Sequence, residues 1–139
     1  MFMIKIPAKV GRLNDMLEFL GLAMDKAGVD SRQQKNVFIS AEEIFVNISS
    51  YAYPHGDGDI TVCMEISPEN IFIEFIDRGV TYNPLDREDP DTTLSLEERE
   101  IGGLGIFMVK NLMDHMSYRH EDGRNILTIQ KNFGAPHGK

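Results

Sequence analysis

The chain has 139 residues, of which 42% are hydrophobic and 26% charged, as is ordinary for one globular domain with a sizeable core. Its formal net charge of -8 at pH 7 argues against nucleic acid or an anionic membrane surface as the main partner. The single cysteine, Cys63, excludes an internal disulfide, and no apolar run is long enough for a signal peptide or a membrane span, so we expect a cytoplasmic protein.

The N-terminal part of the chain predicts a short strand followed by a helix. Phe2, Ile4 and Ile6 alternate with residues of the opposite face before a proline, which is typical of an edge strand. Apolar residues then recur at helical spacing over about 13–27, and Gly28 stands where a helix C-cap is expected.

A second and longer helix is predicted over about 32–53, with Ser31 and Gln34 as a capping box at its start. It carries an apolar face and, beside that face, a polar stripe that consists of Asn36, Ser40, Glu43, Asn47 and Ser50. Because the far side of the helix is apolar as well, the helix should be largely buried and its polar stripe should line a cavity. Glu43 and Asn47, one turn apart, can point together into that cavity. The alternative is a solvated face on which Asn47 only caps the helix or bonds back to it.

Two antiparallel strands are predicted next, over 60–66 and 71–76, because apolar and polar residues alternate in the first segment and β-forming residues dominate the second. The second strand ends in Asp77-Arg78-Gly79, an acidic residue at a strand end followed by a glycine turn. Carboxylates that contact ligands tend to lie at such places. An Asp-x-Gly taken alone, however, is more often a plain turn.

A long acidic segment separates this turn from a group of glycines. Residues 85–100 contain seven acidic side chains against two arginines and little apolar content, so they cannot bury much surface. Their place between two candidate ligand motifs favours a lid. Gly102, Gly103 and Gly105 then predict a backbone-exposing turn that leads into a helix, whose free N–H groups would suit a phosphate chain. The alternative is a glycine-rich helix start that only packs closely against a strand.

The C-terminal part predicts a closing hairpin of residues 116–121 and 124–131 around Asp122-Gly123, a favoured type I′ pair, and a loose tail over 134–139. The four histidines show no metal-ligand spacing. Because the protein is acidic, a nucleotide that it binds should come with a metal ion.

The order of these motifs resembles the Bergerat-fold (GHKL) ATPases, the group that contains gyrase, histidine kinases and mismatch-repair ATPases. Within this group, two segments are similar to the anti-sigma-factor serine kinase branch: Asp77-Arg-Gly-Val-Thr-Tyr-Asn-Pro and the segment over 97–114, Glu-Glu-Arg-Glu-Ile-Gly-Gly-Leu-Gly-Ile-Phe-Met-Val-Lys-Asn-Leu-Met-Asp. The resemblance covers about residues 5–133. It implies an α+β two-layer sandwich in which three helices cover one face of a mixed, mostly antiparallel sheet, with residues 1–139 as a single domain.

The resemblance also implies roles for the residues of these motifs. Asp77 should accept a hydrogen bond from the exocyclic amine of adenine, and Gly79 should let the purine approach the backbone. Asn47 should give a carbonyl oxygen to Mg²⁺, and Glu43 should be the catalytic base toward the attacking hydroxyl. The expected ATP-binding residues are Asn47, Asp77, Gly79, Tyr82, Gly102, Gly103, Leu104, Gly105 and Ile106.

The resemblance implies a magnesium-ATP-dependent protein serine/threonine kinase that is also an anti-sigma factor. By resemblance, it phosphorylates a serine or threonine of a small anti-anti-sigma (STAS-type) protein and binds a sigma factor, and homodimerisation is a further family expectation. The chain departs from the branch at Ile48 and Tyr51, where a small residue and a histidine are frequent, and Thr81 replaces the second glycine of the superfamily's Asp-x-Gly-x-Gly.

Two other functions compete with this prediction. The first is a nucleotide-responsive module that holds a partner without transferring phosphate, but the presence of Glu43 favours an enzyme because binding alone needs no base. The second is the catalytic domain of a histidine kinase, which is less favoured because no phospho-accepting helical hairpin precedes the first predicted strand.

Overall fold

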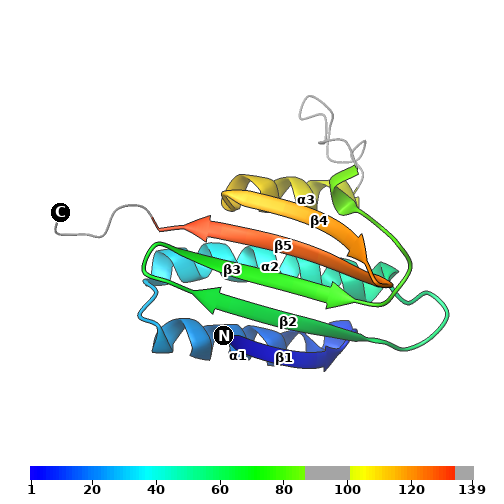
Figure 1. The fold of residues 1–139 in the computed structure, drawn as a ribbon, viewed down its shortest axis with the longest axis horizontal. Coiled ribbons are helices and arrows are strands. Elements are labelled where there is room, and N and C mark those ends of the chain that lie inside the picture. Colours follow the sequence, from blue (N-terminus) through cyan, green and yellow to red (C-terminus); the bar gives the residue numbers. More distant parts are fainter. Residues whose placement is uncertain (87–100, 134–139) are drawn as a thin grey trace.

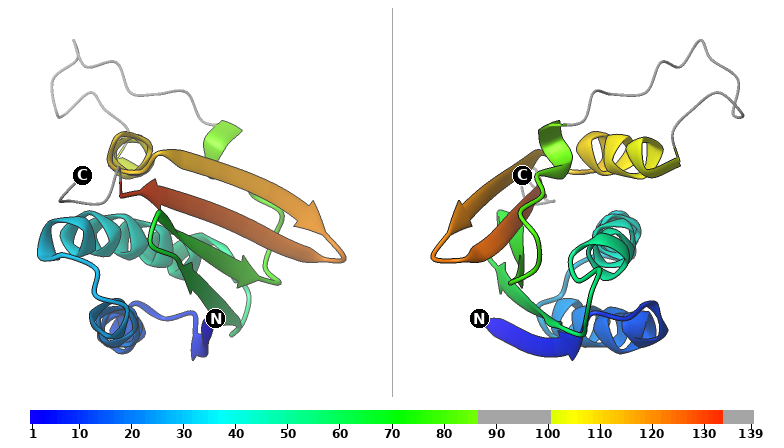
Figure 2. Two further views of the ribbon diagram at one scale, coloured as in Figure 1. Left: turned by 60° about the vertical axis from the view of Figure 1, so that its left-hand side comes forward. Right: turned by 90° about the vertical axis from the view of Figure 1, so that its right-hand side faces the viewer.

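The computed structural model describes residues 1–86 and 101–133, and shows one sheet with helices packed on one of its faces (Figures 1 and 2). The five strands are β1 (Phe2–Pro7), β2 (Asp59–Ile66), β3 (Asn70–Asp77), β4 (His115–Glu121) and β5 (Arg124–Asn132). The three α-helices are α1 (Leu13–Lys26), α2 (Ser31–Tyr51) and α3 (Ile101–Leu112), and short 3-10 turns lie at Val10–Arg12 and Pro84–Asp86. This architecture confirms the predicted two-layer α+β sandwich.

The strand order across the sheet is β1-β2-β3-β5-β4, and each neighbouring pair is antiparallel. The sheet that we expected to be mixed and mostly antiparallel is therefore antiparallel at every pair of described strands. Its central strands turn Ile73, Phe75 and Ile129 toward the helices, where all three are fully buried. Alternation along the strands produces this division, because successive side chains point to opposite faces.

Helix α2 lies in the middle of the helical layer, between α1 and α3 and over β3 (Figure 2). Its Ile44 and Phe45 are fully buried, and burial of such a side chain stabilises the fold by about 1.5–3 kcal/mol. Six of the 21 residues of α2 are buried, so the helix is partly buried rather than largely buried as predicted.

Both ends of α2 differ from the prediction. Asp30 is the N-cap in place of Ser31, and its Oδ1 accepts a hydrogen bond of 2.9 Å from the Gln33 N–H. Asp and Ser are equally good N-caps. Where both occur in a row, the path of the preceding loop determines which of them caps the helix. The helix ends at Tyr51 because Pro54 disfavours helical backbone at the residue before it.

The predicted hairpin between β4 and β5 is confirmed. Asp122 has φ 53° and Gly123 has φ 75°, the two left-handed residues that a type I′ turn requires.

Helix α3 begins at Ile101, so the glycines at 102, 103 and 105 lie in its first turns, and the prediction of a separate turn ahead of the helix is wrong. The unpaired N–H groups of a helix start still belong to this stretch. Residues 87–100, most of the predicted lid, and the predicted tail over 134–139 lie outside the described residues.

Among the described residues, no helix is long and apolar enough to cross a membrane. Within the same part of the chain, no group of three or more His, Cys, Asp or Glu side chains could hold a metal ion.

Candidate functional site

The carboxyl end of β3 carries a buried acidic side chain. Asp77 is 5% exposed, and its Oδ1 accepts two hydrogen bonds of 2.9 Å, one from the Gly79 N–H and one from Asn125 Nδ2. No donor among the described residues reaches its Oδ2. Oδ2 is therefore available to accept a hydrogen bond from a ligand.

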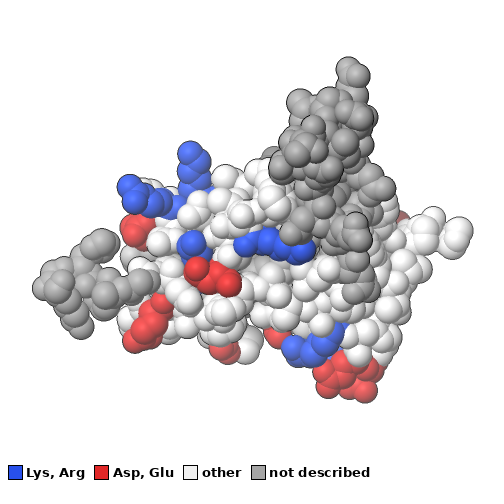
Figure 3. All heavy atoms as spheres, turned by 90° about the horizontal axis from the view of Figure 1, so that it is seen from above, with Lys and Arg blue, Asp and Glu red and all other residues white. Residues whose placement is uncertain are grey.

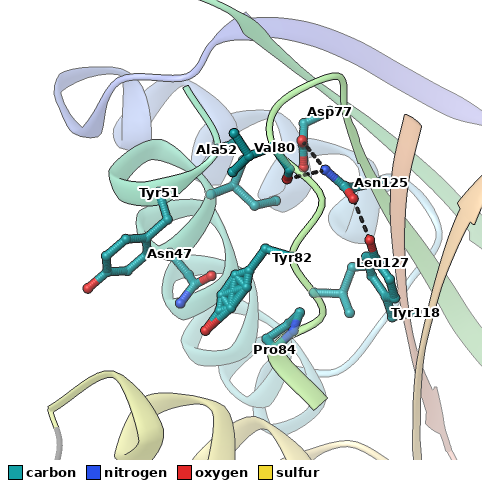
Figure 4. A pocket seen from close by; sticks show the side chains of 11 residues that line it. Asn47, Tyr51, Ala52, Asp77, Val80, Tyr82, Pro84, Tyr118, Asn125 and Leu127 are labelled. Atoms are coloured by element: carbon teal, nitrogen blue, oxygen red, sulfur yellow. Dashed lines mark hydrogen bonds between the residues drawn. The ribbon is translucent and has the colours of Figure 1, made fainter. Parts of the chain in front are cut away.

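Asn125, at the start of β5, is a member of this site that the sequence analysis missed. It lies directly opposite Asp77 in the sheet and is 5% exposed. Its Nδ2 also donates to the Val80 carbonyl over 2.9 Å, and its Oδ1 accepts from the Tyr118 hydroxyl (Figure 4). The available signal was that Asn125 shares the inward face of β5 with Leu127 and Ile129, where a polar residue needs a partner.

The turn after Asp77 is tied to the C-terminal end of α2. The Val80 N–H donates to the Ala52 carbonyl over 2.8 Å. At Gly79 a Cβ atom would lie 2.1 Å from that same carbonyl oxygen, so only glycine fits there without a shift of the backbone. Close packing of backbone on backbone, rather than the purine approach alone, therefore explains this glycine.

We expect Gly79→Ala to lower the free energy of unfolding by about 1–3 kcal/mol, because the clash involves backbone that no side-chain rotation relieves. Urea denaturation measures this change. Gly56→Ala is the matched control, since a Cβ at Gly56 meets nothing within 4 Å. Equal stabilities of the two variants would contradict the close approach at Gly79.

A pocket that is partly open to solvent lies between α2, the turn after β3 and β5. Figure 4 shows Asn47 on α2 close to Tyr82, with the hydrogen-bonded group of Asp77, Asn125 and Tyr118 on the other side of the pocket. Tyr51 and Tyr82 are in edge-to-face contact, with ring centroids 6.2 Å apart and an angle of 77° between the rings. The residues lining the pocket are Asn47, Ile48, Tyr51, Ala52, Asp77, Val80, Tyr82, Pro84, Tyr118, Asn125 and Leu127.

Glu43 lies one helical turn before Asn47 and contacts the start of α3. A Cβ atom at Gly105 would lie 2.2 Å from Glu43 Oε2, so the carboxylate occupies the space that a side chain at 105 would take. The long α2 thus carries two polar side chains of the predicted stripe to different places: Asn47 to the pocket, and Glu43 to the glycine-led helix start.

The structure therefore brings together Asn47, Asp77 and Tyr82 at one pocket and Glu43 with Gly105 at the contact of α2 with α3. Ile106 is 4% exposed, so its side chain anchors α3, and its N–H lies beyond the unpaired donors of the helix start. Gly102, Gly103 and Leu104 lie in the first turn of α3.

Charged side chains are interspersed on the surface around α3. On the face shown in Figure 3, Lys and Arg alternate with Asp and Glu, and the described residues of that face form no broad basic area.

Comparison with known proteins agrees with this fold. Residues 6–131 match the model of the histidine kinase-like ATPase domain, and the chain therefore belongs to that family. The resemblance to GHKL-type ATPases is thus confirmed.

Several curated relatives are named as protein kinases. The chain is 25% identical to the serine-protein kinase RsbW of Bacillus mycoides (strain KBAB4) over 133 residues, which span 89% of this chain and 80% of the relative. It is 27% identical to the serine/threonine-protein kinase BtrW of Bordetella bronchiseptica over 100 residues, 71% of this chain and 70% of the relative. Together with the family, these relatives support a related kinase or ATPase role.

A solved structure, the Acinetobacter baumannii histidine kinase AdeS, aligns with 95% of this chain and 68% of its own, with a TM-score of 0.54 and 11% sequence identity. At this identity the likeness shows the fold alone.

Proposed function

We propose that this protein is a magnesium-ATP-dependent protein serine/threonine kinase that acts as an anti-sigma factor and phosphorylates an anti-anti-sigma protein. One observation carries the proposal: α2 presents Asn47 to the pocket that contains Asp77 and, one turn earlier, Glu43 to the glycine-led start of α3. Phosphoryl transfer from ATP needs a group that recognises the adenine, a metal ligand, a helix start that binds the phosphates, and a catalytic base.

Adenine recognition falls to the end of β3. Asp77 Oδ2, which has no donor among the described residues, accepts the hydrogen bond of the exocyclic amine, while Asn125 and the Gly79 N–H hold Oδ1. Tyr82 contributes a wall of the pocket, and its edge-to-face contact with Tyr51 keeps that wall in place.

The phosphates belong to the other end of the site. The unpaired N–H groups in the first turn of α3, those of Gly102 and Gly103 among them, and the positive end of the α3 dipole bind them. Asn47 offers one amide oxygen, a hard ligand that suits Mg²⁺, an ion that keeps water and phosphate oxygens around it and needs few protein ligands. When bound, the ion neutralises the phosphate charge. Glu43 orients the attacking hydroxyl and accepts its proton.

The substrate and the partners are taken from the resemblance and from the relatives named as serine-protein kinases. The attacking hydroxyl belongs to a serine or threonine of a STAS-type anti-anti-sigma protein, and the chain also binds a sigma factor. The acidic net charge supports action through these proteins rather than through nucleic acid, and a cytoplasmic location and homodimerisation stay predictions.

We expect Asn47→Ala to weaken ATP binding and phosphotransfer together, each about 10-fold or more, because the variant loses a metal ligand. Added magnesium should restore part of both losses. Calorimetric titration of ATP at several magnesium concentrations measures the effect. Asn111→Ala is the control, because Asn111 lies on α3 and its side chain, among the described residues, donates to the Phe107 carbonyl of its own helix. A loss in Asn47→Ala that magnesium leaves unchanged would argue against a metal ligand at this position.

Incubation with γ-labelled ATP, magnesium and candidate STAS-type proteins, followed by mapping of the labelled residue, tests the proposed function. The proposal predicts label on one serine or threonine of a partner. Saturable ATP binding with no transfer to any such protein would favour the nucleotide-responsive binding module instead.

A further inference from the structure

Three successive backbone N–H groups after β3 each have a different acceptor. The Gly79 N–H donates to Asp77 and the Val80 N–H donates to the Ala52 carbonyl. The Arg78 N–H donates to the hydroxyl of Tyr53 over 2.8 Å, and this bond joins residues 25 positions apart. Of the three acceptors, only the Tyr53 hydroxyl is a side-chain group from outside the turn. This one hydroxyl therefore holds the peptide group between Asp77 and Arg78 in place.

The position of the Tyr53 hydroxyl is fixed from two further sides. The hydroxyl donates to the Asp59 carbonyl at the start of β2 over 2.7 Å, which directs its lone pairs toward the Arg78 N–H. The ring lies against Gly58, where a Cβ atom would be 2.2 Å from two ring carbons. Burial raises the pKa of the Tyr53 hydroxyl, so the hydroxyl stays protonated at neutral pH and keeps its donor bond.

Tyr53 does not line the pocket that contains Asp77 and Asn125. Its hydroxyl instead joins Asp59, the first residue of β2, to Arg78, the residue that follows β3. Loss of that hydroxyl would leave the Arg78 N–H without this acceptor and free the peptide that sets the direction of the neighbouring Asp77 side chain.

We propose that Tyr53 is a positioning residue for nucleotide binding: through the Arg78 amide it holds Asp77 in the orientation that presents Oδ2 to the pocket. This inference rests on the proposed function of the site. Tyr53 thus raises the affinity for the nucleotide without contacting the nucleotide.

The test uses Tyr53→Phe, which keeps the ring against Gly58 and removes only the hydroxyl. We expect the dissociation constant of magnesium-ATP to rise about 3- to 10-fold, the range for loss of one hydrogen bond. Amide hydrogen exchange of residues 78–80 should become faster in the free protein, while that of β2 changes less. Gly58→Ala, whose added Cβ would push against the Tyr53 ring, should also raise the dissociation constant of magnesium-ATP. The double variant should bind no more weakly than the weaker single variant, because both changes act through one hydroxyl.

Asp30→Ala is the control for a purely structural effect, because it removes the N-cap at the far end of α2 and should destabilise the protein without changing nucleotide affinity. Unchanged affinity in Tyr53→Phe, with wild-type binding intact, would overturn this inference alone. A rise in the dissociation constant of Asp30→Ala equal to that of Tyr53→Phe would also overturn it. Absence of ATP binding by the wild type would instead overturn the proposed function, and this inference with it.

Discussion

Asp77→Asn should reduce the affinity for ATP about 5- to 150-fold, the loss that corresponds to roughly 1–3 kcal/mol for an unsatisfied buried polar contact. The two donors at Oδ1, the Gly79 N–H and Asn125 Nδ2, require an oxygen at that position. The amide group must therefore place its NH₂ where Oδ2 was, and a donor then faces the exocyclic amine of adenine.

The same orientation predicts a change of base preference. An NH₂ group in place of Oδ2 suits a purine with an oxygen at its 6-position, so Asp77→Asn should lower the preference for ATP over inosine triphosphate. Calorimetric titration with both nucleotides measures this preference. Asp59→Asn is the matched control, because Asp59 is an exposed residue at the start of the neighbouring strand β2, with its Oδ2 3.7 Å from Lys5 Nζ. Unchanged ATP affinity in a folded Asp77→Asn protein would remove this residue from the site.

Glu43→Gln should lower the rate of phosphotransfer roughly 100-fold or more and leave the affinity for magnesium-ATP within a few fold. Glutamine keeps the shape of the side chain beside Gly105 but cannot accept the proton of the attacking hydroxyl. Binding and chemistry should therefore separate at this position, whereas Asn47→Ala should weaken both.

Single-turnover transfer to the partner protein, measured at saturating ATP, tests this separation. Glu42→Gln is the control, since Glu42 is the preceding residue of α2 and is exposed. Transfer by Glu43→Gln at the wild-type rate would exclude Glu43 as the base. A matched loss in Glu42→Gln would show that the helix surface, rather than one carboxylate, is responsible.

Much of the fold follows from local patterns in the sequence. Alternation along β2 predicts which face of the sheet is buried, and Asp122-Gly123 predicts the β4–β5 hairpin, because each signal lies within a few residues. The N-cap of α2 could not be chosen in this way, since Asp30 and Ser31 are both suitable and the preceding loop decides between them.

The candidate site could be predicted where one segment carries the signal and not where two distant segments meet. Asp77, Asn47 and Glu43 stood out by their place on a strand end or on one helix face. Asn125 did not, because its role comes from lying opposite Asp77 in the sheet, 48 residues away in the chain. The hydroxyl of Tyr53 likewise acquires its role only when β2 and the turn after β3 lie beside each other.

The central claim is that the end of β3, the polar face of α2 and the start of α3 form one nucleotide site. Titration of isotope-labelled protein with magnesium and a non-hydrolysable ATP analogue, followed by the amide resonances, tests it directly. The claim predicts saturable shifts at Gly79, Val80, Asn125, Gly105 and Ile106 with a single dissociation constant. Shifts confined to the uncovered face of the sheet, or different constants for the β3 end and the α3 start, would contradict it.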